Sequence, residues 1–199
     1  SVITRRAALT IGSCMKVFKE FTPEVTRLLK FGAVGVIPTD TVYGIATPLL
    51  QMYSVRKLAS LKGRPVDKPI GTILIDSLSQ IEDIVHSSLL QKATIYWPGP
   101  VSVVLPVWSE MIYAHKSKDS LPFRMPDNQV LRELVAQTGP LATTSANLAD
   151  QKTANTVEEA MKIFGDDVDF YVDGGDLSER KASKIIRISQ RGEVEVLRG

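Results

Sequence analysis

The sequence predicts a single α/β domain in which helices cover a β-sheet. Three apolar runs, residues 33–37, 71–75 and 101–107, have the length and composition of buried strands. Between them lie stretches whose apolar residues recur at helical spacing. The 199 residues are enough for one domain with a sizeable core, and no internal repeat or linker-like stretch divides them.

The composition narrows the classes of protein that fit. The formal net charge is only +2, so no basic tail indicates nucleic acid or an anionic membrane as a partner. No apolar stretch has the length that spans a bilayer, so we expect no membrane association. The one cysteine, Cys14, cannot form an intramolecular disulfide, which indicates a reducing compartment and predicts a cytoplasmic protein.

The first residues differ from the rest of the chain. Residues 1–19 contain no acidic side chain and include Arg5 and Arg6, a composition faintly like that of a transit peptide. Their apolar run is short for a secretion signal. We therefore expect residues 1–14 to be an upstream extension or a cloning remnant, and residues 15–199 to form the single domain.

Two helices are predicted in the first third of the domain. Thr22-Pro23-Glu24 has the features of a helix start, with a hydroxyl N-cap, a proline at the first helical position and an acid in the first turn. Gly32 can end that helix. A second helix is predicted over residues 50–61, and it breaks at Gly63.

The later elements follow the same logic. Two short helical stretches, around residues 78–85 and 89–97, precede the rigid corner Trp97-Pro98-Gly99-Pro100, and residues 108–120 are expected to form a surface loop or an irregular hairpin. Asp127 is expected to cap a helix that ends at Gly139. Thr156 and Glu159 predict a capping box, and further strands are predicted at residues 140–143, 168–172, 184–188 and 194–197.

A polar loop, Pro38-Thr39-Asp40-Thr41-Val42-Tyr43-Gly44, follows the first predicted strand. Pro38 ends the strand because it has no N–H to donate to a neighbouring strand. In open α/β sheets, ligands bind in the crevice beyond the strand ends. Thr39 and Tyr43 are therefore candidate ligands for a small polar molecule, and a capped turn without a ligand is the alternative.

A basic loop, Lys62-Gly63-Arg64-Pro65-Val66-Asp67-Lys68-Pro69, follows the second predicted helix. Its two prolines discourage helix and stiffen the loop. Arginine can clamp phosphate oxygens through two parallel hydrogen bonds, and lysine acts as a point charge. Lys62, Arg64 and Lys68 therefore suit a nucleoside triphosphate, and a solvated basic turn is the alternative.

Two more polar groups stand at predicted strand ends. Arg124 lies within the apolar stretch of residues 121–126, where its charge needs an acidic partner or an anionic ligand. Ser145 and Asn147 follow the strand at residues 140–143. Because no G-x-S-x-G setting surrounds Ser145 and neither histidine is obviously placed as its base, we expect these two residues to hydrogen-bond a ligand.

Together these loops predict one basic, hydroxyl-lined cavity, provided that the strand ends are aligned. The basic and hydroxyl side chains of this cavity suit a nucleotide and a small carboxylate. The chain has neither a G-x-x-x-x-G-K-[ST] loop nor a G-x-G-x-x-G fingerprint, so a nucleotide would bind by a less common route. His86 and His115 lack partner spacing and no cysteine–histidine cluster exists, so no metal site is predicted.

The chain resembles the YrdC-like threonylcarbamoyl-AMP synthase family. The resemblance runs from about Met15 to Gly199 and rests on five motifs that occur in the order and approximate spacing of that family. They are Pro38–Gly44, Lys62-Gly63-Arg64 with Lys68-Pro69, Trp97–Pro100, Arg124-Met125-Pro126 and Ser145-Ala146-Asn147.

The resemblance implies a YrdC-like α/β fold, with a twisted mixed sheet flanked by helices around a deep basic cavity. It also implies an L-threonylcarbamoyladenylate synthase, which makes threonylcarbamoyl-AMP and pyrophosphate from L-threonine, bicarbonate or CO2, and ATP, with Mg²⁺. A partner, the tRNA threonylcarbamoyl-transferase complex, then passes the threonylcarbamoyl group to an adenosine of tRNA.

The resemblance also implies roles for individual residues. The family's phosphate-binding pair is matched by Lys62 and Arg64, and its contacts near the α-phosphate and ribose by Ser145 and Asn147; these four form the expected catalytic set. Lys68, Ser183 and Arg198 join them in the expected ATP site. The expected threonine pocket consists of Thr39, Tyr43 and Arg124. No protein nucleophile is expected.

The match has departures and leaves rival functions open. Ser183-Lys184 stands where the family often has a Ser-Thr pair, and Asp40 stands where many members have glutamate. The family's terminal arginine-glycine is matched by Arg198-Gly199, and we expect no counterpart of the additional C-terminal domain of longer members. One rival is an RNA-binding module of the same fold without synthase turnover, and the other is a paralogue that acts in another carbamoyl transfer or hydrolysis.

Overall fold

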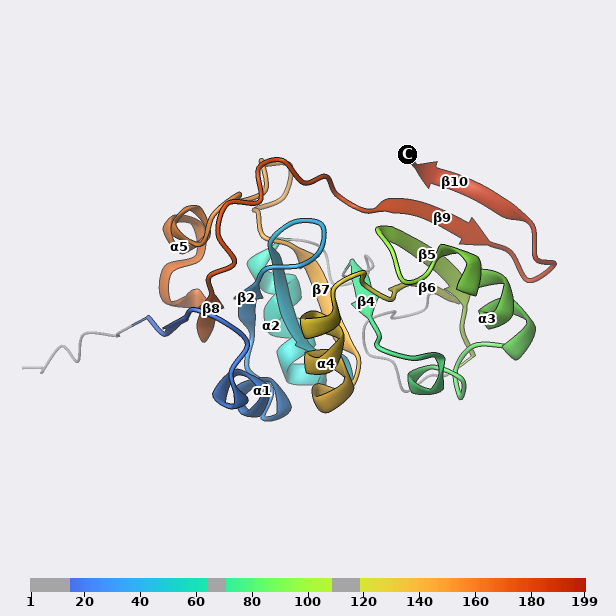
Figure 1. Cartoon of the computed structure of the whole chain (residues 1–199), viewed down its shortest axis with the longest axis horizontal. Helices are drawn as coiled ribbons and strands as arrows, with labels where there is room; N and C mark the ends of the chain where they lie inside the picture. Colours follow the sequence, from blue (N-terminus) through green and yellow to red (C-terminus); the bar gives the residue numbers. More distant parts are fainter. Residues whose placement is uncertain (1–14, 64–70, 109–118) are drawn as a thin grey trace, which may run out of the picture.

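A single mixed β-sheet organises the structure (Figure 1), which is a computed structural model that describes residues 15–63, 71–108 and 119–199. In this part of the chain the sheet has ten strands in the order β1-β8-β2-β3-β7-β4-β6-β5-β9-β10. The strands are β1 Val17–Phe18, β2 Gly35–Ile37, β3 Gly44–Pro48, β4 Thr72–Leu74, β5 Val101–Pro106, β6 Ser120–Arg124, β7 Leu141–Ser145, β8 Phe170–Val172, β9 Lys184–Ile188 and β10 Val194–Arg198.

Five α-helices flank this sheet in the described residues: α1 Pro23–Lys30, α2 Met52–Leu61, α3 Ser87–Ala93, α4 Gln129–Thr138 and α5 Val157–Phe164. Both parallel and antiparallel pairings occur between neighbouring strands of the sheet. For example, β2 pairs parallel with β8 but antiparallel with β3, and β4 pairs parallel with β6 but antiparallel with β7. The predicted α/β class with a mixed sheet is confirmed.

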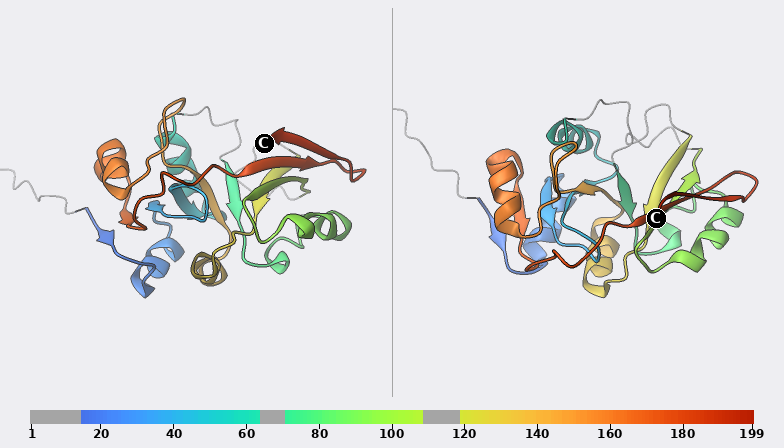
Figure 2. Two further views of the ribbon diagram at one scale, coloured as in Figure 1. Left: turned by 45° about the horizontal axis from the view of Figure 1, so that its top comes forward. Right: turned by 90° about the horizontal axis from the view of Figure 1, so that it is seen from above.

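Helices cover both faces of the left half of the sheet in Figure 1, and the views in Figure 2 agree. Val36 of β2 packs with α2 and α5, whereas the next residue, Ile37, packs with α1 and α4. This alternation follows from the twofold repeat of a strand, which sends successive side chains to opposite faces. Helix α3 packs with the right half, where Val103, Phe123 and Ile186 are buried.

The helix starts agree only in part with the sequence prediction. Thr22 caps α1 by accepting a hydrogen bond from Val25 N, and Thr156 caps α5 by accepting one from Glu159 N, as expected. The cap of α4 was predicted one residue too early, because Asn128 Oδ1 accepts from Leu131 N at 2.9 Å. The predicted helix at residues 78–85 is wrong, since only a short 3₁₀ turn forms, at Leu78–Gln80.

Two strands were not predicted, and one of them is central to the site. Strand β3 lies between β2 and β7 in the middle of the sheet, and all five of its residues are buried. Strand β1 is a two-residue strand at the sheet edge. The stretch around Arg124, predicted as an apolar edge or strand end, is the interior strand β6, with Arg124 as its last residue.

One long connection joins the two halves of the sheet. Residues 173–183, here called the crossover segment, run from β8 to β9 across the top of the molecule in Figure 1. The side chain of Leu177 is buried, and its backbone N donates to Asn155 O at 2.9 Å. The crossover segment therefore packs against the domain, and it passes close to the loop between β2 and β3, as the contacts below show.

Candidate active site

The loop between β2 and β3 is held by its own threonines. Thr39 Oγ1 donates to Val42 O at 2.6 Å and lies 3.0 Å from Thr41 Oγ1, and it accepts from Thr41 N at 3.1 Å. Thr39 and Thr41 are each only 5% exposed. Thr39, a predicted threonine-binding residue, therefore shapes the loop through its hydroxyl.

Tyr43 fastens this loop to the crossover segment. Its hydroxyl donates to Gly175 O and accepts from Gly174 N, both at 2.8 Å. A side chain at Gly174 would overlap Pro38, so a glycine is required where the segment crosses the loop. Arg180 makes a second link, because its Nη1 donates to Thr39 O at 2.6 Å. Burial raises the pKa of the Tyr43 phenol above its ordinary value of 10.

Replacing Tyr43 by phenylalanine should destabilise the protein by about 1–3 kcal/mol, because Gly174 N and Gly175 O would lose their buried partner. The raised pKa favours the neutral phenol in the folded state. The contribution of the neutral Tyr43 phenol to the free energy of unfolding is therefore fully present below pH 10. It is lost as the pH rises through the pKa of Tyr43 in the folded state. Urea unfolding from pH 7 to 11 should show a smaller alkaline loss in Tyr43→Phe than in wild type, and equal losses would contradict this assignment.

Lys62 follows α2 and points at the end of β7. Its side chain is buried, and its Nζ donates to Ser145 O at 2.9 Å and to Asn147 O at 2.7 Å, with the Asn147 side-chain oxygen also in contact. Ser145 Oγ donates to Asn147 Oδ1 at 2.6 Å. Three residues that the sequence predicted as separate parts of one nucleotide site are thus brought into one cluster.

Arg124 meets the Thr39 loop from the other side. Its Nη1 is paired with Asp40 Oδ1, and the two side chains are 4% and 8% exposed. The other Asp40 oxygen accepts from Asp127 N at 3.0 Å. The acidic partner that Arg124 required is therefore Asp40, which the sequence analysis noted only as a departure from the family.

Ser183 and Arg198 also lie together. Both Nε and Nη2 of Arg198 donate to Ser183 O, at 3.1 and 2.6 Å. Ser183 Oγ lies 2.9 Å from Ser102 Oγ, which in turn lies 2.9 Å from Thr72 Oγ1. This row of hydroxyl groups, buried at Ser183 and Ser102 and partly exposed at Thr72, reaches β7, since Thr143 Oγ1 donates to Thr72 O at 2.7 Å.

Strand β7 connects these clusters. Gly44 of β3 lies opposite Ser145 of β7, and Ala146 N donates to Tyr43 O at 2.9 Å. The Lys62 cluster therefore adjoins the Tyr43 loop. Arg64 and Lys68 lie outside the described residues, so their place beside Lys62 and the predicted deep basic cavity stay predictions.

Several groups that position this site were not predicted from the sequence. Asp40, Arg180, Gly174 and the hydroxyl of Ser102 contact predicted residues directly. Asp40 carried a signal, because it lies inside a predicted ligand loop and Arg124 required an acidic partner. The sequence of the crossover segment contains no signal of its contacts with Tyr43 and Thr39, since these contacts join residues more than 130 positions apart.

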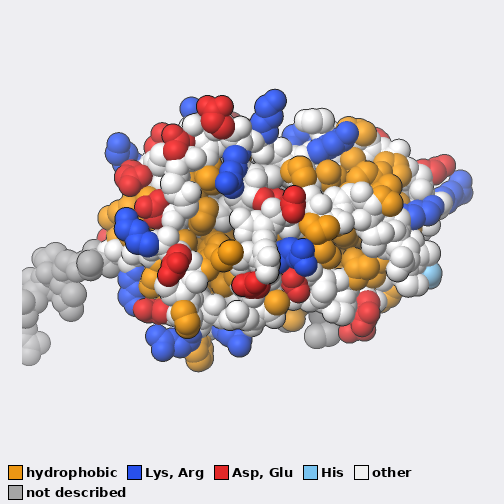
Figure 3. Space-filling model, in the orientation of Figure 1, with side chains coloured by type: hydrophobic (Ala, Val, Ile, Leu, Met, Phe, Trp, Pro, Cys, Tyr) orange, Lys and Arg blue, Asp and Glu red, His pale blue; other side chains and the backbone are white. Residues whose placement is uncertain are grey.

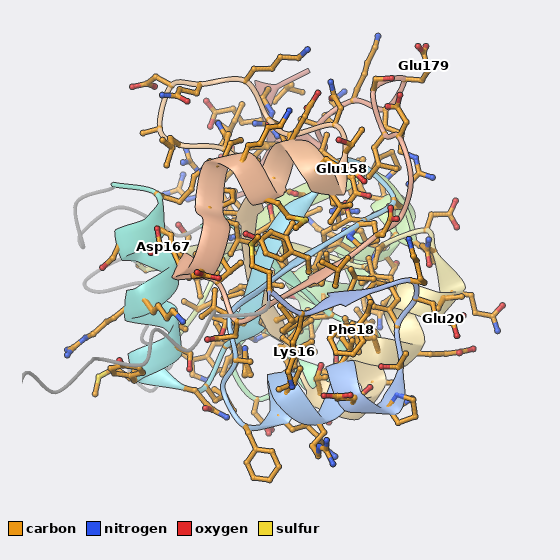
Figure 4. The ribbon with its side chains drawn as sticks, turned by 90° about the vertical axis from the view of Figure 1, so that its left-hand side faces the viewer. Lys16, Phe18, Glu20, Glu158, Asp167 and Glu179 are labelled. Atoms are coloured by element: carbon orange, nitrogen blue, oxygen red, sulfur yellow. The ribbon has the colours of Figure 1, made fainter. Side chains whose placement is uncertain are left out.

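Other features of the described residues do not belong to this site. A pocket of about 390 Å³ lies between α2 and α5, lined in part by Leu61, Phe164 and Asp167, and no predicted site residue lines it. Figure 4 shows Asp167 between the end of α5 and α2. Within residues 15–63, 71–108 and 119–199, no group of His, Cys, Asp and Glu side chains could hold a metal ion, and no helix has the length and apolar character needed to cross a bilayer.

The fold and the site define an α/β protein whose polar strand-end loops suit an anionic ligand. The Sua5/YciO/YrdC family model, described as "Telomere recombination", matches residues 27–199. The chain belongs to this family.

The relatives of the chain are similar over most of its length. A putative threonylcarbamoyl-AMP synthase of Mycobacterium leprae is 34% identical over an alignment of 181 positions, and the match covers 85% of this chain and 82% of that protein. One of Methanocaldococcus jannaschii is 30% identical over an alignment of 197 positions, and the match covers 93% of this chain and 92% of that protein.

Two solved structures have the same fold. P. abyssi Sua5 complexed with L-threonine is 25% identical with a TM-score of 0.80, and the match covers 94% of this chain but only 57% of that longer one. E. coli YciO, 18% identical, has a TM-score of 0.78, and the match covers 93% of this chain and 95% of that one. The YciO likeness shows the fold alone.

Proposed function

We propose that this protein is an L-threonylcarbamoyladenylate synthase, which makes threonylcarbamoyl-AMP and pyrophosphate from L-threonine, bicarbonate or CO2, and ATP. The observation that carries the proposal is the cluster of Lys62, Ser145 and Asn147 at the end of β7. The cluster stands beside a loop that holds a buried arginine–aspartate pair. Curated relatives that are 34% and 30% identical to this chain are named putative threonylcarbamoyl-AMP synthases.

In the proposed reaction, the amino nitrogen of L-threonine bonds to the carbon of bicarbonate or CO2 and gives an N-carboxylated threonine, with release of water from bicarbonate or of a proton when CO2 reacts. Its carbamate oxygen attacks the α-phosphorus of ATP, the new P–O bond forms, and the bond from that phosphorus to the departing pyrophosphate breaks. The nucleophile belongs to the substrate, so the protein contributes orientation and neutralisation of charge. This division of work requires no protein nucleophile.

The nucleotide side of the proposed site consists of Lys62, Arg64, Ser145 and Asn147, which form the catalytic set, together with Lys68, Ser183 and Arg198. Lys62 is held in place by backbone oxygen acceptors of the protein itself. A fixed cation stabilises developing charge on a leaving pyrophosphate without reorganising during the reaction. Ser183 and Arg198 approach from the β9 side of the sheet.

The amino-acid side of the proposed site consists of Thr39, Tyr43 and Arg124. Arg124 suits the carboxylate because guanidinium groups bind carboxylates through paired hydrogen bonds. The hydroxyl groups of Thr39 and Tyr43 are bonded to the backbone of the loop and of the crossover segment. In this proposal the two residues shape the pocket wall around the substrate.

Mg²⁺ is part of the proposal as a companion of ATP. Mg²⁺ commonly binds through substrate phosphates and few protein carboxylates. The described residues fit that mode, since no acidic cluster could hold the ion and both oxygens of Asp40 are bonded to Arg124 and Asp127 N. When bound, the ion would supply positive charge to the triphosphate.

The product would be consumed by the tRNA threonylcarbamoyl-transferase complex, and we infer that both steps take place in the cytoplasm. Threonylcarbamoyl-AMP is a mixed anhydride, and its activated carbonyl suits transfer to an adenosine of tRNA. Figure 3 shows cationic and anionic side chains mixed across one face of the molecule, a distribution that gives no specific support to the RNA-binding alternative.

The test is pyrophosphate release from ATP in the presence of bicarbonate and Mg²⁺, with L-threonine, L-serine, L-alanine or no amino acid. We expect release that depends on threonine, together with a product of the mass of threonylcarbamoyl-AMP. A well-folded protein that releases no pyrophosphate but binds RNA with steep salt dependence would overturn the proposal in favour of the RNA-binding module.

A further inference from the structure

We infer that Asp40 is a positioning residue that turns the Arg124 guanidinium so that its Nε edge receives the carboxylate of the amino-acid substrate. This inference deepens the proposed function and rests on it for the identity of the substrate. In this inference Asp40 does not touch the substrate. It acts by fixing which edge of the Arg124 guanidinium faces the substrate.

The first observation is that each carboxylate oxygen of Asp40 has a hydrogen-bond partner. Oδ1 is paired with Nη1 of Arg124, the last residue of β6. Oδ2 accepts from Asp127 N at 3.0 Å, just before α4 begins. Asp40 therefore ties the guanidinium to the β2–β3 loop and to the turn between β6 and α4 at once. With both oxygens engaged, the arginine tip is fixed in place.

The second observation is the edge that this arrangement leaves. A guanidinium has five N–H donors, and the Nε–H points in the same direction as one N–H of Nη2. Among the described residues, the one contact of Nη2 is long, 3.4 Å to Thr41 Oγ1. Nε is buried and has no hydrogen-bond partner within residues 15–63, 71–108 and 119–199. Asp40 thus occupies the Nη1 side, and the unfilled edge is the one that grips a carboxylate through two parallel bonds.

A buried charged donor without a partner is unfavourable, so its presence needs an explanation. A ligand carboxylate on the Nε edge supplies the missing acceptor. Because Arg124 Nε is shielded from water, neighbouring groups must move aside when the carboxylate binds. Binding is therefore accompanied by a local rearrangement.

Asparagine is the sharpest replacement for Asp40, because it keeps the shape and removes the charge. Nη1 of Arg124 and Asp127 N are both donors. An asparagine side chain has one acceptor oxygen and one donor NH2 group, so one of the two donors would face another donor. The guanidinium then loses its fixed orientation, and small misplacements of a binding group weaken binding strongly.

Removing the negative charge of Asp40 has opposite effects on carboxylate binding in the two possible roles, neutralisation and positioning, so the test distinguishes them. If Asp40 merely neutralised Arg124, its replacement by asparagine would strengthen binding of a second carboxylate, since a nearby negative charge would be gone. If Asp40 positions Arg124, the same replacement weakens binding. We expect positioning to dominate, with threonine affinity in Asp40→Asn falling by about tenfold or more.

The experiment follows the arginine Nε–H resonances by NMR while ligand is added without ATP. The Arg124 resonance is assigned by its loss in Arg124→Lys. In wild type, L-threonine should shift this resonance, and L-threoninol, which has no carboxylate, should leave it in place. Asp40→Asn should need about tenfold more threonine for the same shift, and its KM for threonine should rise while its KM for ATP stays constant.

The matched control is Asp76→Asn, which makes the same chemical change in the half-exposed pair between Asp76 and Arg132. It should behave as wild type in every titration. An unchanged or tighter threonine affinity in Asp40→Asn, or an equal shift with threoninol, would overturn the inference. The wild-type comparison of threonine with threoninol does not depend on the folding of any variant.

The outcomes also separate this inference from the proposed function. Threonine-dependent pyrophosphate release without any shift of the Arg124 Nε–H would leave the synthase proposal standing and remove the positioning role. A carboxylate-dependent shift that is lost in Asp40→Asn, in a protein that releases no pyrophosphate, would support the positioning role and remove the synthase proposal.

Discussion

Replacement of Lys62 by methionine should lower the rate of threonine-dependent pyrophosphate release by about 10²–10³-fold, the range found when one preorganised donor to developing charge is removed. Methionine keeps much of the length and apolar stem of lysine, so the main change is the loss of the ammonium group. The rate should fall at saturating ATP, because the proposed role of Lys62 lies in neutralising pyrophosphate as it leaves.

The same replacement also disturbs the end of β7. Ser145 O and Asn147 O would lose a donor that lies within 2.9 Å of each. Buried acceptors left without a donor lower the free energy of unfolding by about 1–3 kcal/mol. The stability of each variant must therefore be measured by urea unfolding beside the turnover assay, and rates compared at a temperature where both proteins are folded.

Lys57→Met, within helix α2 that precedes Lys62, is the matched control. Lys57 is paired with Asp169 at 3.0 Å near the surface, away from the Lys62 cluster. Such a partly exposed pair contributes about 0–1 kcal/mol, so this variant should keep both turnover and stability. Equal turnover in Lys62→Met and Lys57→Met would remove Lys62 from the catalytic set.

Much of the candidate site was predictable because its residues cluster in short motifs at strand ends. Lys62, Ser145 and Asn147 come from two separate motifs, and one cluster joins them. The sequence predicts that the two motifs lie close together because Lys62 follows an apolar helix, and Ser145 and Asn147 follow an apolar strand. It could not predict that Lys62 is buried against backbone carbonyl groups, because burial depends on how α2 packs against β7.

The errors in the fold have physical causes. Strand β3, Gly44–Pro48, begins with glycine and ends with proline, two residues that usually interrupt strands. It forms because it fills the space between β2 and β7 and is paired on both sides. Tertiary pairing thus overrides a weak local preference. The cap of α4 is Asn128 and not Asp127, because it is the Asn128 side chain that accepts from the N–H three residues later, that of Leu131.

The remaining part of the site depends on contacts that no local pattern contains. Tyr43 reaches Gly175, and Arg180 reaches Thr39 O, across more than 130 positions in the sequence. The crossover segment thereby becomes part of the wall beside the predicted threonine pocket. A polar loop predicted from sequence alone would leave the Tyr43 hydroxyl free for a ligand, whereas the structure gives that hydroxyl two backbone partners.

Removal of Arg124 alone should be among the most destabilising single changes in the described part of the chain. In Arg124→Leu, Asp40 would remain buried without its cation, and breaking a buried pair in this way lowers the free energy of unfolding by about 3–5 kcal/mol. Urea unfolding should therefore show a much lower midpoint than wild type. Threonine should no longer stabilise the variant, because the proposed carboxylate-binding group is gone.

The double variant Arg124→Leu with Asp40→Leu separates folding from binding. Replacing a buried ion pair by apolar residues is often neutral for stability, although Asp127 N would lose its acceptor at a further loss of about 1–3 kcal/mol. The double variant should thus recover part of the stability lost in Arg124→Leu, yet regain none of the threonine binding. Recovery of threonine binding would show that the pair serves folding alone, and a double variant no more stable than Arg124→Leu would show that Asp40 is not the charge left stranded.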